Sequence, residues 1–286
     1  MNSCSFFQEP SGLYPECAEA VFPEKLWFFP GCDEALKNAA ADGDLAFVSS
    51  YLAVCADART PDVHNALLAS SLYGQTEIVR SFLNAGANKD VTDAQFRTPL
   101  IVASLGQQAG VVELLLRTGV NIEAKNSDGN TALMCAADTP DGFGDGSVVS
   151  LLLEGGADIE AADDDAGDTA LMKACNNGNA TIVDILLRAG AGTETENAYG
   201  QTALLCSLCT PSVSVVKLLL EAGANVNALS HTELTALMDA AENGCDEIVE
   251  LLVDAGARLD SRDCLGASAL DKAMEKGHIS LTGMLM

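Results

Sequence analysis

Basic residues are scarce in this chain. Among its 286 residues, 15 Lys and Arg stand against 41 Asp and Glu, which gives a formal net charge of −26 at pH 7. Such a field repels phosphate backbones and anionic lipid surfaces, so nucleic acids and membranes are poor partners. A protein partner with basic segments fits this charge, although acidity alone also serves to keep a surface-rich protein soluble.

Long hydrophobic runs and targeting signals are also missing. No uncharged apolar run approaches the roughly 20 residues that a membrane-spanning helix needs. The N-terminal stretch has no early Lys or Arg, and Pro10, Pro15 and Pro23 interrupt it, which is not the layout of a signal peptide. These absences predict a cytoplasmic protein, with the nucleus as the alternative. They also predict that the ten cysteines are reduced and mostly packed.

The motifs of common enzyme classes are absent as well. There is no GxSxG nucleophile turn, no P-loop, no HExxH zinc motif and no GxGxxG that opens a helix after a strand. A catalytic group assembled from distant parts of the chain would leave no such motif. We expect a protein without catalytic activity and without a cofactor.

A repeat of 33 residues is the main feature that the sequence does have. Its full copies begin with Thr or Ser, then Pro or Ala, then Leu, at Thr98, Thr131, Thr169, Thr202, Thr235 and Ser268. Weaker copies begin at Asn65 and Glu34. An apolar phrase such as 215–220 (VVKLLL) follows within each unit, and then a glycine. Apart from one spacing of 38 residues the period of the full copies is constant, which indicates one structural unit per copy.

Each unit is predicted to be a pair of helices. The Thr or Ser hydroxyl can accept a hydrogen bond from an unpaired N–H at a helix start, and Pro99 suits the first helical turn. The first helix is rich in Ala and the second in Leu, and the glycine ends the second helix in a left-handed conformation. One such unit cannot bury its own apolar face, so the units must stack.

This pattern resembles the ankyrin repeat family over residues 32–286, in its period, its Thr-Pro/Ala-Leu helix start and its Leu-rich second helix before Gly-Ala. The resemblance implies an all-α solenoid of about eight helix-turn-helix units, degenerate at the ends, with short β-turn fingers. It also implies a non-catalytic adaptor that binds a protein partner on its concave face. The family's usual histidine after Leu, with its hydrogen-bond network, is replaced here at Leu68, Ile101, Met134, Met172, Leu205, Met238 and Asp271.

The two ends of the chain depart from the repeat. Residues 1–31 hold half of the aromatic residues, including the single tryptophan, Trp27, and two interpretations are open. They form either a hydrophobic cap on the first unit or a short docking motif for a partner's groove. At the other end, Asp271 predicts a polar capping unit and hence a monomeric array. Against the cap, Leu281, Leu285 and Met286 would lie on a frayed final helix.

Two irregularities suggest metal or redox chemistry. The 38-residue spacing adds about four residues in the stretch 138–146, between the two helices of one unit, and one residue in the acidic finger 163–168. Clustered carboxylates can hold Ca²⁺, but EF-hand spacing is not met, so a solvated acidic loop is the simpler interpretation. Cys206 and Cys209 form a CxxC pair, but zinc needs two more ligands and a thioredoxin-like site needs a βαβ context. We expect packed thiols and no bound metal.

The resemblance also implies where a partner would bind, on the fingertips and the exposed positions of each first helix. Carried over unit by unit, the candidate contacts are Asp62, His64, Tyr73, Gln95, Arg97, Ser127, Asp128, Asn130, Asp138, Asp165, Asp168, Asn176, Asn177, Tyr199, Gln201, His231, Thr232, Glu242 and Asn243. Tyrosines are enriched among binding hot spots, so Tyr73 and Tyr199 are the expected anchors. The acidic centre of this set favours a basic partner. Two alternatives stay open: a regulatory or targeting subunit of an enzyme complex, or the repeat portion of a larger multidomain protein.

Overall fold

The fold was analysed in a computed structural model, which describes residues 32–54, 57–140 and 144–286. The aromatic segment 1–31, expected to be a cap or a docking motif, lies outside these residues. In the described part of the chain every regular element is a helix, and one isolated β-bridge joins Ala162 to Thr169. The all-α class predicted by the repeat is confirmed. No described helix combines the length and the apolar character that a membrane crossing requires.

The helices form successive pairs, and each pair is one unit. The first members, which we call the inner row, are α1 (Cys32–Asp42), α3 (Pro61–Leu72), α5 (Pro99–Leu105), α7 (Ala132–Ala137), α9 (Ala170–Asn176), α11 (Ala203–Cys206), α13 (Ala236–Glu242) and α15 (Ala269–Lys276). The second members, the outer row, are α2 (Leu45–Val54), α4 (Thr76–Asn84), α6 (Ala109–Arg117), α8 (Ser147–Glu154), α10 (Ala180–Arg188), α12 (Val213–Glu221), α14 (Asp246–Asp254) and the 3₁₀ helix η1 (Ile279–Gly283).

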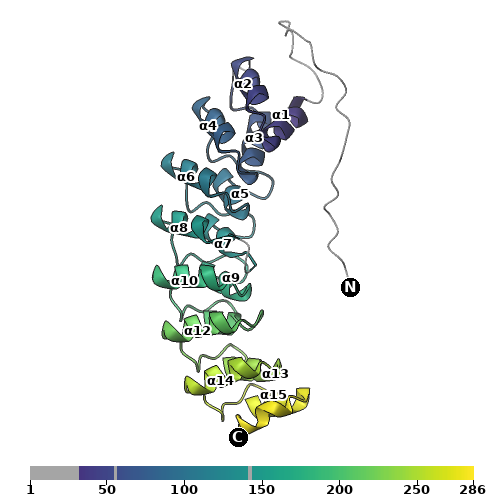
Figure 1. The fold of residues 1–286 in the computed structure, drawn as a ribbon, viewed down its shortest axis with the longest axis vertical. Coiled ribbons are helices and arrows are strands. Elements are labelled where there is room, and N and C mark those ends of the chain that lie inside the picture. The colour runs from purple at the N-terminus through teal and green to yellow at the C-terminus, as the bar shows by residue number, and fades with distance from the viewer. Residues whose placement is uncertain (1–31, 55–56, 141–143) are drawn as a thin grey trace.

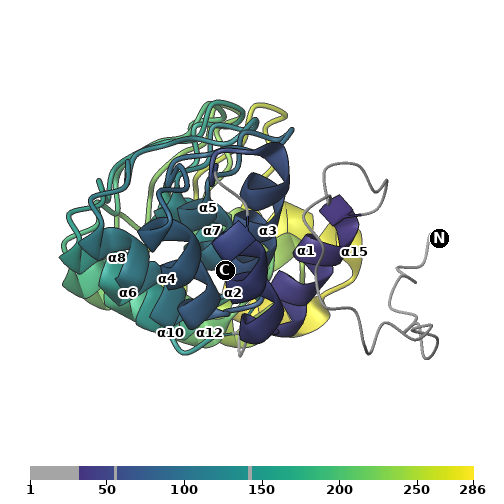
Figure 2. The same ribbon diagram turned by 90° about the horizontal axis from the view of Figure 1, so that it is seen from above.

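The units stack into an elongated, curved solenoid with the inner row on the inside of the curve (Figure 1). Neighbouring inner helices contact each other, as α3 does with α5 and α7 with α9, and outer helices do the same, as α6 does with α8. The loops that join one unit to the next project to one side of the helices and form a row of fingers (Figure 2). Because the units are held in register by the helices, the fingers form one continuous surface.

Helix starts follow the predicted capping chemistry in most units. The hydroxyl of Thr98 accepts a hydrogen bond from the N–H of Ile101, and Thr131, Thr169 and Thr235 do the same in their own helices. Thr60 and Thr202 are exceptions, because their buried hydroxyls have no hydrogen-bond partner among the described residues. The helix that follows Thr202, α11, has only 4 residues. The unit that begins at Thr202 is therefore the one with the weakest inner helix.

The unit assigned to Asn65 starts earlier than the repeat predicts. α3 begins at Pro61 with Thr60 as the N-cap residue, so Asn65 lies inside the helix. Thr followed by Pro at the first helical position is a stronger start signal than Asn-Ala. The register of the repeat is still right, because Leu67 is fully buried, as Leu100 is one unit later.

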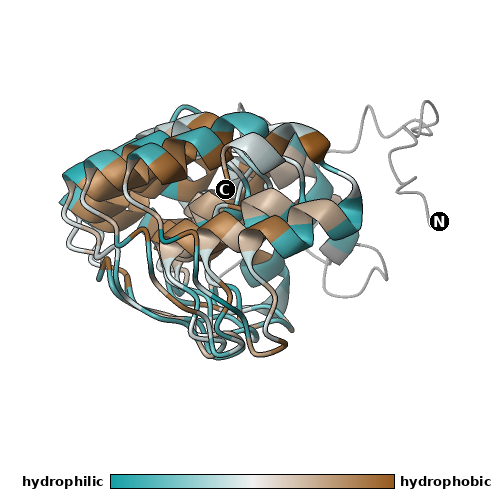
Figure 3. Ribbon diagram, turned by 90° about the horizontal axis from the view of Figure 1, so that it is seen from below, coloured by the Kyte–Doolittle hydropathy of each residue, from teal (hydrophilic) through white to brown (hydrophobic). Residues whose placement is uncertain are grey.

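The core is a continuous apolar layer between the two rows of helices (Figure 3). The repeated Leu of each unit from Leu100 to Leu237 is buried, and so are the apolar residues that stand where the resembled family usually has histidine. Glycines end the outer helices as predicted; Gly190, for example, has a φ of 95°. This region of backbone conformation favours glycine because a Cβ atom is strained there.

The C-terminal unit ends in a 3₁₀ helix and not in the frayed helix that was weighed against the predicted cap. Leu281 is fully buried and Leu285 is 4% exposed, and they lie on and after η1, a 3₁₀ helix in place of an α-helix. Asp271 and Ser268 form a capping box at the start of α15. Asp271 is exposed, and its side chain caps the helix on which it lies. Met274 on the same helix is 63% exposed.

Candidate interaction surface

The fingers are linked to one another by a ladder of backbone hydrogen bonds. Each finger precedes the N-cap residue of an inner helix, as 92–97 precedes Thr98. The rungs of this finger ladder run from backbone N to backbone O between Ser127 and Gln95 (2.9 Å), Asp164 and Asp128 (3.4 Å), Ala198 and Ala166 (2.7 Å), His231 and Tyr199 (2.9 Å), and Cys264 and Thr232 (3.2 Å). The ladder fixes each fingertip relative to the next, so the tips can present side chains as one rigid strip.

A buried or half-buried side chain holds each fingertip from inside. In the finger of Tyr199, the Oδ1 atom of Asn197 accepts hydrogen bonds from the N–H groups of Tyr199 (3.0 Å) and Gln201 (2.9 Å). The equivalent anchors of the six fingers are Asp93, Asn126, Asp163, Asn197, Ser230 and Asp263. None of these residues is among the contacts predicted from the sequence. Their signal is an Asp, Asn or Ser five residues before the helix-start Thr or Ser, or six in the one longer finger.

The left-handed tip position is glycine in four fingers but not in all. Phe96 has a φ of 56° and Glu233 a φ of 59°, where the other fingers have glycines such as Gly129 (77°) and Gly266 (81°). Non-glycine residues are uncommon in this region of backbone conformation. Both exceptions are exposed, and Phe96 is 60% exposed. Phe96 and Glu233 therefore expose a side chain at the tip position, where the other four fingers have glycine.

The structure leaves every sequence-predicted contact residue at least partly accessible. The exposed ones are Tyr73, Gln95, Ser127, Asp128, Asp138, Asp165, Tyr199, His231, Thr232 and Asn243. The half-buried ones are Asp62, His64, Arg97, Asn130, Asp168, Asn176, Asn177, Gln201 and Glu242. They are divided between the fingertips and the inner row, as predicted, and their role in binding stays a prediction.

Several of the half-buried candidates are already engaged inside the protein. Arg97 Nε lies 2.7 Å from Asp93 Oδ2, so this guanidinium steadies its own finger. Asp168 accepts a hydrogen bond from Asn197 Nδ2 at 2.8 Å. Glu242 pairs with Lys272 at 3.0 Å. These side chains shape the surface but are less available to a partner than the exposed carboxylates.

An open acidic notch lies between two fingers at the centre of the array. It has a volume of about 380 Å³ and is lined by Ser127, Asp128, Asp164 and Asp165. Lys125 Nζ contacts Asp164 Oδ1 at 2.7 Å, so one of the three carboxylates has a cationic partner. The surface therefore keeps a net negative potential here, as the sequence predicted for the centre of the candidate set.

Asp163, the first of the clustered acidic residues, is not a solvated ligand. Its side chain is 5% exposed, lies 2.8 Å from Lys173 Nζ, and anchors three backbone N–H groups. Burial raises its pKa, but the hydrogen bond and charge of Lys173 and the backbone N–H groups lower the pKa below its usual value on balance. Among the described residues no three His, Cys, Asp or Glu side chains gather as a metal site would require. The simple reading of 163–168 as a fully solvated loop was wrong for Asp163.

Part of the chain's acidity has a structural use. On the turns that follow the outer helices, carboxylates accept hydrogen bonds from backbone N–H groups of the next unit. These pairs are Asp90 with Asn121 (2.9 Å), Glu123 with Asp158 (2.9 Å), Glu160 with Gly192 (2.7 Å) and Glu194 with Asn225 (2.9 Å). The net charge therefore reflects stacking of the units as well as solubility.

The thiols of the inner row are packed rather than reactive. Cys175 is fully buried, and burial raises its pKa well above the usual value. Burial and the nearby Asp168 raise the pKa of Cys206 to about 12. Its CxxC neighbour Cys209 lies beyond the end of α11 and is exposed, so the prediction of packed thiols was wrong for Cys209. Metal binding and thiol exchange both need the thiolate, which these surroundings disfavour.

Replacing Cys175 with Ala is expected to lower the free energy of unfolding by about 1 kcal/mol, because it removes one small buried group. EDTA should leave the melting temperature of the wild-type protein unchanged, since packing and not metal binding accounts for the thiols. Urea titration of both proteins and a thermal melt with and without EDTA measure these effects. A melting temperature that falls in EDTA would instead indicate a metal site.

Comparisons with known proteins agree with this architecture. The family model described as "Ankyrin repeats (3 copies)" matches residues 36–126, 66–163 and 141–230, and "Ankyrin repeat" matches residues 232–264. The chain therefore belongs to the ankyrin repeat family. Members of this family generally bind other proteins, and the fold is typically a non-catalytic interaction module.

Individual relatives show the same likeness over different lengths. The chain is similar to the Caenorhabditis elegans "Ankyrin repeat and KH domain-containing protein mask-1", at 34% identity over 131 residues, which is 44% of this chain and 5% of that protein. Among solved structures it is similar to the ankyrin repeat domain of Bcl-3, "a unique member of the IkappaB protein family", with a TM-score of 0.64 and 30% identity over 79% of this chain and 98% of that one. The human ASB11 ankyrin repeat domain gives a TM-score of 0.66 and 26% identity over 78% and 98% of the two chains.

Proposed function

We propose that the fingertips and inner row bind a basic segment of a protein partner. The observation that carries this proposal is the distribution of charge along the chain. Residues 126–172 contain no Lys or Arg but eleven Asp and Glu, and this stretch supplies the central fingers. Of these carboxylates, Asp128 and Asp165 are exposed on adjacent fingers and line the same notch. A regulatory or targeting subunit would use the same surface.

The exposed carboxylates favour fast, salt-sensitive association with a cationic segment of a partner. Carboxylates on a rigid strip act on an approaching cationic segment over about one Debye length, which is about 8 Å at physiological ionic strength. Such steering raises association rates by about 10-fold to 1000-fold. The ladder of backbone bonds holds the tips in place before binding, so little ordering is required when the partner arrives. A monomeric array leaves this whole strip open.

Neutralising Asp128 and Asp165 together should lower the association rate of a basic peptide about tenfold at low salt. The probe is a fluorescent peptide with six Lys separated by Gly-Ser spacers, and the measurement is stopped-flow anisotropy over a range of NaCl concentrations. The doubly substituted protein, Asp128→Asn and Asp165→Asn, should also show a shallower dependence of the rate on salt.

The control for this experiment carries the same change in net charge at another place. Glu154→Gln and Glu221→Gln neutralise two exposed carboxylates at the ends of α8 and α12 in the outer row. We expect the control to bind nearly as the wild type does. If both pairs lowered the rate equally, net charge and not the finger surface would govern binding, and the proposal would be wrong.

A further inference from the structure

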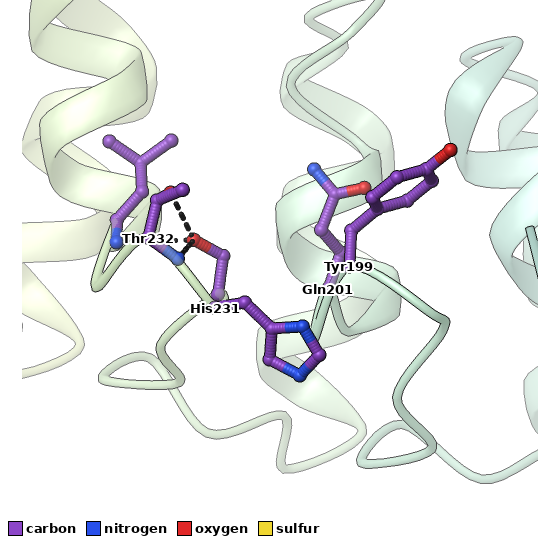
Figure 4. A pocket seen from close by; sticks show the side chains of 6 residues that line it. Tyr199, Gln201, His231 and Thr232 are labelled. Carbon is purple, nitrogen blue, oxygen red and sulfur yellow. Dashed lines mark hydrogen bonds between the residues drawn. The ribbon is translucent and has the colours of Figure 1, made fainter.

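A second notch lies between the fingers 196–201 and 229–234. It has a volume of about 270 Å³ and is lined by Tyr199, Gln201, Ser230, His231, Thr232 and Leu234. Figure 4 shows Tyr199 and Gln201 on one side, Thr232 on the other, and the imidazole of His231 between them. The backbone bond from His231 N to Tyr199 O, 2.9 Å long, fixes the separation of the two walls.

Three of the polar side chains in this notch, Ser230, Thr232 and Gln201, have hydrogen-bond partners within the protein. The hydroxyls of Ser230 and Thr232 lie 2.9 Å apart and bond to each other. The side-chain oxygen of Gln201 accepts a hydrogen bond from Asn197 Nδ2 at 3.3 Å. What remains available is mostly carbon, from Leu234 and from the ring of Tyr199, which is 61% exposed. An occupant therefore needs an apolar portion to fill the notch.

The surroundings of the notch are acidic. Glu233 is exposed and stands in the chain between the lining residues Thr232 and Leu234, although it does not line the notch itself. The finger of Asp165 lies directly beside that of Tyr199, joined to it by the bond from Ala198 N to Ala166 O (2.7 Å). Neither finger of the notch contains a Lys or Arg. These neighbouring carboxylates therefore favour a cationic occupant.

We propose that this notch receives an arginine of the partner's basic segment. The aliphatic stem packs against Leu234, the guanidinium plane stacks on the ring of Tyr199, and Glu233 balances the charge. Arginine fits better than lysine because its planar, weakly hydrated head stacks on aromatic rings, while the lysine ammonium is a strongly hydrated point charge. This assignment rests on the proposed function, and it adds a residue preference that acidity alone does not give.

The test compares two peptides of equal length and charge, one with six Arg and one with six Lys, each separated by Gly-Ser spacers. We expect the wild-type protein to bind the Arg peptide about fivefold more tightly, which corresponds to a cation–π gain of about 1 kcal/mol. Tyr199→Leu should reduce this ratio to about one and leave the affinity for the Lys peptide nearly unchanged, whereas Tyr199→Phe should keep it. Glu233→Gln should lower the affinity for the Arg peptide more than for the Lys peptide.

The matched control is Tyr73→Leu, which removes a tyrosine that is 60% exposed and lies at the end of α3, away from the notch. It should leave the Arg-to-Lys ratio unchanged. Equal affinity of the wild type for both peptides, or an equal loss of preference in Tyr73→Leu, would overturn the arginine site while leaving the basic-segment proposal intact. Tighter binding when one Arg is replaced by Leu would show that the notch takes an aliphatic residue. If neither peptide bound better than a neutral Gly-Ser peptide, the proposed function itself would fall.

Discussion

Asp163→Ala should lower the free energy of unfolding by about 3–5 kcal/mol, the largest effect expected of any single substitution considered for this protein. Removal of the carboxylate leaves the buried ammonium of Lys173 without its partner at 2.8 Å. It also leaves three backbone N–H groups of the finger, those of residues 166 to 168, without their acceptor. Urea unfolding at pH 7, followed by far-UV circular dichroism, measures the change.

Three further substitutions separate the causes. Asp163→Asn keeps an oxygen for the backbone N–H groups but removes the charge, so it should cost less than Asp163→Ala. Lys173→Met should also cost less than Asp163→Ala, because Asp163 then keeps its backbone donors. The control is Lys125→Met, which breaks the more exposed pair with Asp164 (39% and 67% exposed) and should cost less than about 1 kcal/mol. A cost of Asp163→Ala no greater than that of Lys125→Met would refute the structural role of this pair.

The pair also predicts a pH dependence. The pKa of Asp163 is lowered in the folded protein, so its contribution to stability is present above its unfolded pKa of about 3.9 and is lost as pH falls through the folded pKa. Burial lowers the pKa of Lys173, but the hydrogen bond and charge of Asp163 raise it above its usual value on balance. The contribution of Lys173 to stability is therefore lost only as the pH rises through this raised pKa. The stability difference between wild type and Asp163→Asn should therefore persist at neutral pH and shrink on acidification.

The pKa of Asp239, on α13 of the inner row, shifts in the opposite sense to that of Asp163. Burial and the nearby Glu242 raise its pKa, and a hydrogen bond from Asn243 and the charge of Lys272 only partly oppose this. Lys272 is instead held by Glu242 (3.0 Å) and Asp263 (3.1 Å), an arrangement that repeats the pairing of Lys173 with the anchor Asp163. A buried anchor carboxylate with a lysine from the following helix is thus used twice in this array.

The sequence predicted what depends on local chemistry. Thr98 caps its helix, Gly190 ends one in the left-handed conformation, and Leu100 is buried, because each is determined by neighbouring residues and by the stacking that the 33-residue period requires. The start of α3 was misplaced because the period was followed there in preference to the stronger signal at Thr60-Pro61.

The features that could not be predicted from the sequence depend on contacts between units. Asp163 looked like one of several acidic loop residues, and only the packing of its finger against α9 shows that it is buried beside Lys173. Tyr199 was identified as an exposed aromatic anchor, but the notch beside it exists only because the next finger carries His231 at a fixed separation. The anchors themselves have a readable signal, a distance of five or six residues to the helix-start Thr or Ser.

Gly129→Ala is expected to destabilise the protein by about 2–5 kcal/mol and to weaken binding of the basic peptides. Gly129 has a φ of 77°, where a residue with a Cβ atom is strained by about 1–2 kcal/mol. Its added methyl group would also overlap the backbone nitrogen and side chain of Asp164 on the next finger, and backbone cannot move as cheaply as a flexible side chain. Overpacking of this kind typically costs about 1–3 kcal/mol more. The displaced finger carries Asp165, so the acidic notch should change shape.

Gly266→Ala is the matched control, because it separates the strain of the left-handed backbone from the contact between fingers. Gly266 occupies the same tip position in the last finger, with a φ of 81°, but nothing lies within 4 Å of the site of its added Cβ atom. Gly266→Ala should therefore lower the free energy of unfolding only by the strain of the left-handed backbone, about 1–2 kcal/mol, and leave peptide binding unchanged. Phe96 and Glu233 show that a side chain is tolerated at this position when the neighbouring finger leaves room. Equal losses of stability and affinity in the two variants would mean that the finger ladder does not hold the interaction surface in shape.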